Sequence, residues 1–406
     1  MRDQNSSSGL SLGKSSLLPQ EEMLEIGKKQ KKLIIGIPRE SRNDEYRVPL
    51  TPEAVGLLVD NGHDVIIETN AGNEASYVDT DYSEYGGFIV DNKKEVFRSD
   101  IVLKVAPLSL EEIELLKGNQ VIISSLHITK QSEAFIRKIM QKKVTAIAFE
   151  NLKDKFDCYP VVRSMSEIAG ITSILIASEY LSNVHKGKGV MLGGITGITP
   201  AEVIILGAGT AAEYAARASL GLGAMVKVFD NSIHKLRRLQ YFVGQRLYTS
   251  IFHPKVLEKA LRSADVVIGA VHLVSKRPWF YITEDMVKLM KKGSVIVDIS
   301  IDQGGCVETS QSTDHHNPVY TRHGVIHYAV TNIPSRVART ASIALSNVFS
   351  PILLNIGRSG GIQVQLKEDK GLRRGVYIYN GILTNEFIGK HFGIQSKDIE
   401  LLLAAF

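Results

Sequence analysis

Short apolar runs separated by helical patterns recur along the chain from residue 33 onward. In the first half, the runs that read as buried strands cover residues 33–37, 65–68, 101–105, 121–125 and 144–149. Between the first two, Thr51 and Pro52 form a typical helix start, and Asn61 with Gly62 a typical helix end. Strands that alternate with helices in this way predict a parallel sheet wrapped by helices.

The second half repeats this alternation. Its expected strands cover residues 203–206, 225–229, 266–269, 295–298 and 326–330, and a long helical segment at 166–183 precedes them. A periodic run at 338–356 predicts another long helix, and helical patterns recur at 381–405. The sequence therefore predicts an α/β fold of two doubly wound, Rossmann-like domains with parallel sheets and an interdomain cleft. We expect a flexible extension at 1–31, a first domain at 32–160 completed by the tail at 338–406, and a second domain at 161–337.

The composition is that of a soluble globular protein, with 44% apolar and 22% charged residues. A net charge of +5 is small for 406 residues and the basic residues are dispersed, which favours no nucleic-acid partner. The two cysteines, Cys158 and Cys306, form no CxxC pair, so we expect neither disulfides nor zinc, and a reducing, cytoplasmic location. No apolar run approaches the roughly 18 residues of a membrane helix, and no metal-ligand spacing connects the histidines, so we expect no membrane partner and no metal.

A glycine-rich turn links the expected strand at 203–206 to a helix. It consists of Gly207, Ala208, Gly209, Thr210, Ala211 and Ala212. In this pattern the first glycine allows a tight bend, the second lets the backbone approach a pyrophosphate, and the small third residue lets helix and strand pack closely. Asp230 ends the next strand, at the distance where a carboxylate binds ribose hydroxyls. The alternative is an ordinary strand-to-helix turn, but the context predicts a dinucleotide site.

The carboxylate of Asp230 would repel a 2′-phosphate, which favours NAD over NADP as the cofactor. The following helix carries three basic residues that could offset that repulsion, namely Lys235, Arg237 and Arg238. The simpler interpretation is that they form a solvated helix face.

Other polar residues occur where strands end. Asp302 follows the strand at 295–298 and precedes a Gly-Gly turn, His127 follows the strand at 121–125, and Lys104 interrupts an apolar strand. Carboxyl ends of parallel strands are where open α/β folds keep their ligands. Each has a plainer alternative: Asp302 could cap its turn, His127 could be structural, and Lys104 could mark a strand end. Arg47 could equally form a surface ion pair with Glu45.

Several sequence blocks occur together and in order: GIPRE at Gly36, EYRVPLTP at Glu45, MSEIAG at Met165, GAGTAA at Gly207, IDQGGC at Ile301 and TNIPSR at Thr331. With these blocks the chain resembles, from about residue 33 to its C-terminus, the family of alanine dehydrogenases and proton-translocating transhydrogenase alpha subunits. The dehydrogenase branch has a histidine and an aspartate at the positions of His127 and Asp302, whereas the transhydrogenase branch has neither. The resemblance therefore favours the dehydrogenase branch.

The resemblance implies roles for individual residues. Arg47 and Lys104 would hold the carboxylate and carbonyl oxygen of the substrate, and His127 and Asp302 would manage protons and water. Ser166, Lys235 and Asn332 would contact the cofactor, together with the glycine turn. Two local departures are the short loop after Lys104 and the segment at 272–278, where contacts to adenosine are expected.

The expected activity is the reversible, NAD-dependent oxidative deamination of L-alanine to pyruvate and ammonia, with a hexameric assembly. The first domain would then supply the substrate residues and the second would bind NAD. Two alternatives stay open at this point: an NAD(H)-binding transhydrogenase alpha-type subunit, and a catalytically silent NAD-binding protein.

Overall fold

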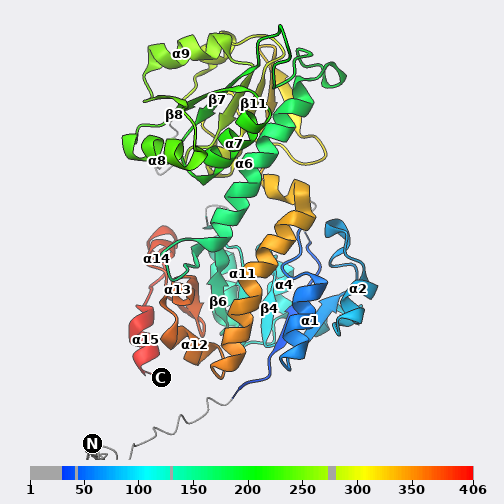
Figure 1. Cartoon of the computed structure of the whole chain (residues 1–406). Coiled ribbons are helices and arrows are strands. Elements are labelled where there is room, and N and C mark those ends of the chain that lie inside the picture. The colour runs from blue at the N-terminus through cyan, green and yellow to red at the C-terminus, as the bar shows by residue number, and fades with distance from the viewer. Residues whose placement is uncertain (1–29, 42–43, 129–130, 273–279, 406) are drawn as a thin grey trace, which may run out of the picture.

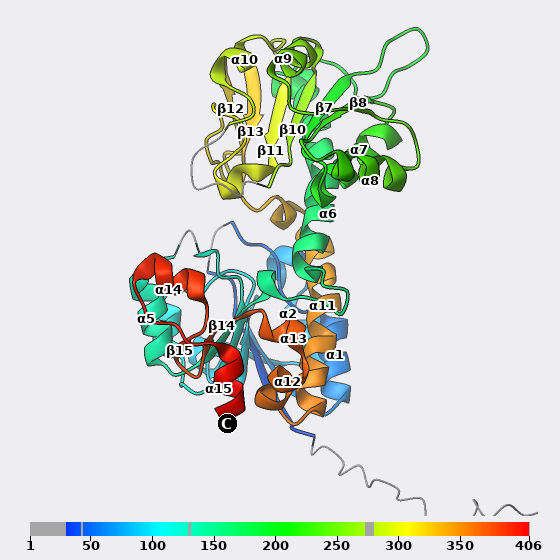
Figure 2. The ribbon, with the colours of Figure 1, turned by 90° about the vertical axis from the view of Figure 1, so that its left-hand side faces the viewer.

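The computed structural model of the chain describes residues 30–41, 44–128, 131–272 and 280–405. Two sheets lie one above the other along the long axis of the molecule, and two long helices, α6 (Pro160–Leu181) and α11 (Ala338–Arg358), run between them (Figures 1 and 2). The segment predicted to contact adenosine falls outside the described residues except for its first residue, as does nearly all of the N-terminal extension.

The first sheet has the strand order β15-β14-β6-β5-β4-β1-β2-β3. Its strands are β1 (Ile34–Ile37), β2 (Asp64–Glu68), β3 (Phe88–Val90), β4 (Ile101–Leu103), β5 (Val121–Ser124), β6 (Thr145–Ala148), β14 (Val376–Tyr379) and β15 (Ile382–Leu383). The six strands from the first half are parallel, whereas β14 pairs antiparallel with β6 and with β15. The C-terminal tail thus extends the sheet of the first half.

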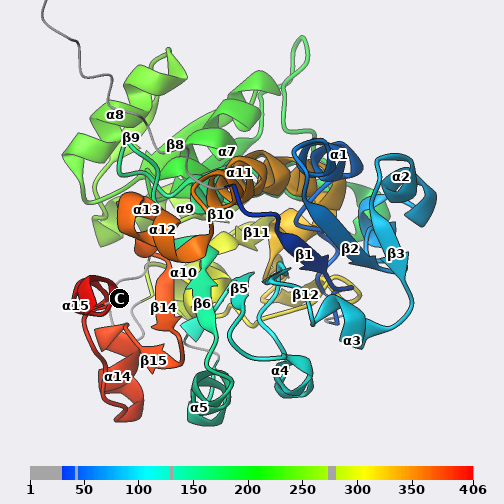
Figure 3. The same cartoon turned by 90° about the horizontal axis from the view of Figure 1, so that it is seen from below.

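Helices lie on both sides of this sheet, as the view from below shows (Figure 3). The helices α1 (Pro52–Asp60), α11, α12 (Ile362–Glu368) and α13 (Lys370–Arg373) share one apolar core with the sheet. The helices α4 (Leu110–Leu115), α5 (Glu133–Gln141) and α14 (Glu386–Phe392) form another core on the opposite face. The shorter helices are α2 (Asp79–Glu84), α3 (Lys93–Val96) and α15 (Ile399–Ala405), with the 3₁₀ helices η2 (Asn73–Ala75) and η4 (Phe149–Asn151).

The second sheet has the order β12-β13-β11-β10-β7-β8-β9. Its strands are β7 (Glu202–Leu206), β8 (Met225–Phe229), β9 (Tyr248–Ser250), β10 (Val266–Gly269), β11 (Val295–Asp298), β12 (Val319–Arg322) and β13 (Val325–Tyr328). All neighbouring pairs are parallel except β12 with β13. One face packs on α6, α7 (Thr210–Gly221) and α8 (Ile233–Val243), and the other on α9 (Pro254–Ser263) and α10 (Glu284–Lys288). The 3₁₀ helices here are η5 (Asn183–His185), η6 (Ile299–Gln303) and η7 (Ile333–Val337).

Three details differ from the sequence expectation. The helical pattern expected from residue 381 begins instead with β15, after the unpredicted strand β14. Helix α6 begins at Pro160, six residues before the predicted start. Proline suits the first helical position, because the amide hydrogen that it lacks would have no partner within the helix there. Both sheets are mixed rather than wholly parallel, since β12, β14 and β15 add antiparallel edges.

Two helical segments, Pro160–Leu181 and Ile333–Arg358, have the length and mean hydropathy of a membrane span, contrary to the expectation that no run approaches that length. Buried residues make up 44% and 50% of their most apolar windows. The two helices contact each other, and each contributes to the apolar core of a sheet. This is the environment of core helices in a globular protein.

Close packing fixes α6 against the helix that follows the glycine turn. A Cβ atom added at Gly170 would lie 2.3 Å from the carbonyl oxygen of Ala211 and 3.0 Å from the amide nitrogen of Ala215. Only glycine therefore allows α6 to cross the first turns of α7 at this distance. The position of the dinucleotide turn is thereby linked to the long helix that joins the two sheets.

Candidate active site

The glycine turn has the geometry that its sequence predicts. Gly207 has a φ angle of 100°, and a Cβ atom there would lie 2.3 Å from the carbonyl oxygen of Ala270. Gly209 caps α7, and a Cβ atom there would meet nothing within 4 Å. Ala212 is fully buried, while Thr210 and Ala211 are half-buried in the first turn. The backbone is therefore crowded behind the turn and open in front of Gly209, which fits a pyrophosphate at a helix N-terminus.

Asp230 lies beside this turn at the end of β8. Its Oδ2 accepts a hydrogen bond from the Ala208 amide at 2.8 Å, and its Oδ1 accepts one from the Ser232 amide at 2.7 Å. These bonds fix the carboxylate next to the turn. Each carboxylate oxygen can accept a further bond, so the arrangement is compatible with ribose hydroxyls.

Lys235 and Ser166, which the resemblance also connects with the cofactor, lie on different helices. Lys235 is exposed in the first turn of α8, where its amide bonds to Ser232 Oγ at 3.3 Å. Ser166 is half-buried on α6, one turn before Gly170. Contact between these side chains and a cofactor remains a prediction.

Arg47 is a nearly buried cation whose orientation is set by Glu45. The Nε and Nη2 atoms of Arg47 each donate to a different Glu45 oxygen at 2.6 Å, and Nη1 approaches Met165 Sδ at 3.3 Å. Burial alone would lower the pKa of Arg47, but Glu45, followed by Glu40 and Asp302, raises it. The exposed surface ion pair considered above is therefore wrong, since the two side chains are only 11% and 5% exposed.

Lys104 lies just beyond β4 and has no exposed side-chain surface. Its Nζ is 2.6 Å from Glu40 Oε2 and 3.7 Å from Glu112 Oε2. Burial raises the pKa of Glu40 to about 7, although Lys104 acts to lower it and Glu45 adds to the rise. The expected strand at 101–105 thus ends at Leu103, and the lysine begins the loop at the carboxyl edge of the sheet.

His127 follows β5 and has a φ angle of 46°. A left-handed backbone at a non-glycine residue is uncommon, and such strain concentrates at functional sites. Glu150 Oε1 stabilises it by accepting the amides of Leu126 at 2.8 Å and His127 at 3.1 Å. Burial raises the pKa of Glu150, and these two amides only partly offset that effect.

Asp302 lies in η6, directly after β11, and its side chain is exposed. The loop around it is held by the fully buried Asp298, whose Oδ1 accepts the Ser300 amide at 3.1 Å and whose Oδ2 accepts the Cys306 amide at 3.0 Å. Gly304 and Gly305 both have positive φ, at 108° and 82°, so the Gly-Gly turn needs glycine. The negative charge of Asp302 contributes to the raised pKa of Arg47, which belongs to the first domain.

Asn332 joins the two halves. Its Nδ2 donates to the carbonyl oxygen of Asp44 at 3.1 Å and to Glu45 Oε2 at 3.0 Å. The neighbouring Ser335 Oγ accepts the Tyr46 amide at 2.8 Å. The segment that carries Arg47 is therefore held by Asn332 and by Ser335 of η7. Contact between Asn332 and a cofactor remains a prediction.

Four carboxylates that organise this site were missed as functional residues from the sequence. Glu40 holds Lys104, Glu45 holds Arg47, Glu150 supports the His127 loop and Asp298 supports the Asp302 loop. Glu45 could have been found, because it lies two residues before Arg47. Asp298 could likewise have been found, because it lies four residues before Asp302, whereas Glu40 and Glu150 are brought to the site only by the sheet topology.

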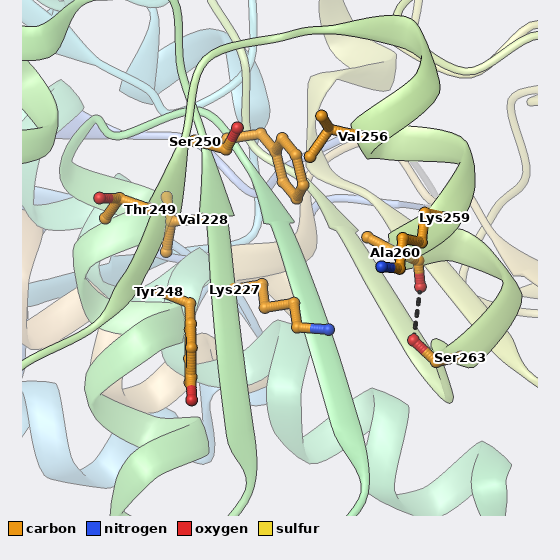
Figure 4. A pocket seen from close by; sticks show the side chains of 10 residues that line it. Lys227, Val228, Tyr248, Thr249, Ser250, Val256, Lys259, Ala260 and Ser263 are labelled. Atoms are coloured by element: carbon orange, nitrogen blue, oxygen red, sulfur yellow. Dashed lines mark hydrogen bonds between the residues drawn. The ribbon is translucent and has the colours of Figure 1, made fainter.

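A cavity of about 360 Å³ lies elsewhere, between β8, β9 and α9 (Figure 4). Its lining includes Lys227, Tyr248, Val256, Lys259 and Ser263, and none of the predicted site residues among those described. Lys227 is already paired with Glu202. This cavity is thus distinct from the site assembled at the strand ends.

Comparisons with known proteins identify the family of the chain. Residues 36–169 match the family described as alanine dehydrogenase/PNT, N-terminal domain, and residues 173–386 match alanine dehydrogenase/PNT, C-terminal domain. Among curated proteins, alanine dehydrogenase 2 of Staphylococcus aureus (strain USA300) is 38% identical over 367 residues, covering 90% of this chain and 98% of its own length. Alanine dehydrogenase of Staphylococcus saprophyticus is also 38% identical, over 91% of this chain and 100% of its own.

Solved structures show the same relationship. A structure of L-alanine dehydrogenase superposes with a TM-score of 0.84 at 35% identity, covering 89% of this chain and 99% of that one. A transhydrogenase from Sinorhizobium meliloti superposes with a TM-score of 0.73 at 22% identity, which shows a shared fold. The chain therefore belongs to the alanine dehydrogenase/PNT family.

Proposed function

We propose that this protein catalyses the NAD-dependent oxidative deamination of L-alanine. The observation that supports it best is that Asn332, which follows the second sheet, donates a hydrogen bond to Glu45 Oε2, the same carboxylate oxygen that accepts a hydrogen bond from Arg47 Nη2 in the first domain. The charge of Asp302, which follows β11 of the second sheet, also raises the pKa of Arg47. A substrate carboxylate and a nicotinamide need these two sides in one place. Relatives that share 38% identity over nearly their whole length are named alanine dehydrogenases.

Arg47 binds the substrate carboxylate in this proposal. Glu45 accepts hydrogen bonds from one edge of the guanidinium, formed by Nε and Nη2. The other edge, formed by Nη1 and Nη2, can hold a second carboxylate through two hydrogen bonds. The bond between Nη1 and Met165 Sδ is weak, and a carboxylate would replace it favourably. Glu45 thus orients the arginine without filling its substrate edge.

Lys104 polarises the oxygen on the reacting carbon. Its ammonium has three N–H groups, and Glu40 accepts one of them at 2.6 Å. Since no part of the Lys104 side chain is accessible in this structure, we propose that a substrate oxygen reaches one of its other two N–H groups after a small rearrangement around it, with the Glu40 contact retained.

His127 and Asp302 handle protons and water. Alanine, NAD and water are converted to pyruvate, ammonium, NADH and a proton, so the site must add water to an iminium and then release ammonia. An imidazole titrates near neutrality and can take the proton from the attacking water, while the Asp302 carboxylate orients that water. A bound NAD, held by the glycine turn and Asp230, would supply the hydride acceptor.

The test of this assignment separates chemistry from cofactor binding. We expect His127→Ala and Asp302→Asn to lose at least about 100-fold in kcat with L-alanine, as is usual when a proton-transfer group is removed. Both variants should bind NADH as the wild type does, measured by fluorescence titration. Full activity in both variants would sink the assignment of these residues.

The cofactor preference proposed here is NAD over NADP. Asp230 is fixed beside the glycine turn, where its charge would oppose a 2′-phosphate. The exposed Lys235 could attract such a phosphate, so the comparison of kcat/KM with the two cofactors is decisive. A preference for NADP would contradict the role of Asp230.

We also propose a cytoplasmic homo-oligomer, a hexamer by resemblance to the family. Large apolar side chains remain exposed on α6 and on the loop that follows it, among them Ile171, Leu175, Met191, Ile195 and Ile198. Exposed apolar patches of this kind mark contacts between proteins. Light scattering of the purified protein would give the mass directly, and a monomeric mass would contradict this proposal.

A further inference from the structure

The ammonium of Lys104 is enclosed and needs a counter-ion. No part of its side chain is exposed, and burial of an unpaired ammonium is strongly unfavourable. Glu40 Oε2 lies 2.6 Å from Nζ, whereas the nearest oxygen of Glu112 lies at 3.7 Å. Glu40 therefore provides the short contact.

Glu112 is committed to other partners. Its Oε1 accepts a hydrogen bond from Lys93 Nζ at 2.8 Å, and its Oε2 accepts one from the Ser109 amide at 2.8 Å. The second bond belongs to the capping box that begins α4. Movement of Glu112 toward Lys104 would break this cap, so it is a poor substitute for Glu40.

The backbone at the end of β4 fixes Glu40. Its Oε1 accepts the Val105 amide at 2.6 Å and the Ala106 amide at 3.3 Å. The carboxylate is thus oriented by the residues that directly follow Lys104. Glu40, from the segment after β1, is therefore hydrogen-bonded both to the backbone that follows β4 and to the Lys104 ammonium, and so fixes the ammonium relative to that strand end.

We propose that Glu40 is a positioning residue of the substrate site, which fixes the Lys104 ammonium and keeps it protonated in the alkaline range where amino acids are oxidised. This inference rests on the function proposed above.

The electrostatic surroundings support it. Burial by itself would lower the pKa of Lys104, but Glu40, and after it Glu112, raises that pKa above its ordinary value. Glu45 and Arg47 also act on this cluster, and Lys93 is paired with Glu112. Since the pKa of Glu40 is about 7, its carboxyl is ionised in alkaline solution and can act there as the counter-ion.

The variant Glu40→Gln removes the charge and retains the size of the side chain. Burial then dominates at Lys104, and the protonated fraction falls tenfold for each pH unit above its lowered pKa. We expect the ratio of wild-type to variant kcat/KM for L-alanine to grow by at least roughly tenfold between about pH 7.5 and about pH 10. A ratio that stays constant over this range would overturn the proposal, however large the ratio is.

Glu45→Gln is the matched control, because it removes a carboxylate from Arg47 and leaves the short contact of Lys104 intact. We expect it to raise the KM for L-alanine by a factor that is nearly independent of pH. Glu40→Asp should recover part of the alkaline activity. A control with the same pH-dependent loss as Glu40→Gln would also contradict the specific role of Glu40.

A second measurement does not need turnover. Urea unfolding of the wild type, Glu40→Gln, Lys104→Met and the double variant gives the coupling between the two side chains. We expect the double variant to unfold at a higher urea concentration than the summed effects of the single variants predict. Coupling without alanine turnover would contradict the proposed function alone, whereas additive effects would contradict the role of Glu40.

Discussion

Gly170 offers a sharp test of how the fold positions the dinucleotide turn. In Gly170→Ala the added Cβ atom would lie 2.3 Å from the Ala211 carbonyl oxygen, where ordinary contacts begin at 3.4 Å. Helices α6 and α7 would have to separate by roughly 1 Å, and overpacking of this kind typically costs about 1–3 kcal/mol. The displaced residue, Ala211, lies in the first turn of α7, directly after Gly209 and Thr210.

Part of this cost should therefore appear in cofactor binding. If about 1–2 kcal/mol of this cost results from displacement of the glycine turn, the Kd for NADH rises by about 5- to 30-fold. This effect is indirect, because Gly170 is assigned only a packing role. Fluorescence titration with NADH measures the Kd, and urea unfolding measures stability.

Gly221→Ala is the matched control on α7, because a Cβ atom there meets nothing within 4 Å. We expect it to leave the Kd unchanged and to stabilise the protein by about 0.4–1 kcal/mol. If Gly170→Ala binds NADH and unfolds as the wild type does, the reasoning about helix contact is refuted.

Three further predictions concern the two sides of the site and the core. Gly209→Ala should leave the stability within about 0.5 kcal/mol of the wild type, since its Cβ atom enters open space. The variant should bind NADH more weakly, because a pyrophosphate would use that space. An NADH affinity equal to that of the wild type would place the cofactor elsewhere. Arg47→Lys should raise the KM for L-alanine by at least about tenfold, because lysine lacks the planar two-pronged contact of a guanidinium. The Kd for NADH should change little. An unchanged KM would remove Arg47 from the substrate site. Burial lowers the pKa of His327 to about 4, so this histidine takes up a proton more readily in the unfolded chain than in the folded protein. The wild type should therefore lose about 2 kcal/mol of stability as the pH falls from about 7 to about 4.5. The raised pKa of Glu40 has the opposite effect and adds stability as the pH falls over the same range. The contribution of His327 is therefore measured by comparing the pH dependence of urea unfolding in the wild type and in His327→Gln. Identical pH dependences would contradict the prediction.

The sequence predicted the central strands of both sheets because they are buried on both faces and therefore read as continuous apolar runs. It did not predict β3, β9, β12 or β15, which lie at or near sheet edges and are only two to four residues long. Such strands are defined by their neighbours more than by their own pattern. The antiparallel return of β14 onto β6 depends on contacts between residues more than 200 positions apart, which no local pattern encodes.

Part of the candidate site was equally accessible from the sequence. The glycine turn with Asp230 follows from spacing alone, and the structure gives Gly207 the positive φ and close backbone contact that the pattern requires. By contrast, the burial of Lys104 and its pairing with Glu40, 64 positions away, could not be predicted. Local sequence shows which residues can carry chemistry, whereas the counter-ions that set their charge come from topology.

We expect the chain to oxidise L-alanine with NAD. The most direct measurement is NADH formation by the purified full-length protein with L-alanine and NAD at alkaline pH, with pyruvate determined in the same samples. We expect NADH and pyruvate to form in equal amounts, and activity to be lost when NAD is omitted. Binding of NADH without turnover of alanine or other small L-amino acids would contradict the claim and would favour a transhydrogenase-type subunit or a silent NAD-binding protein.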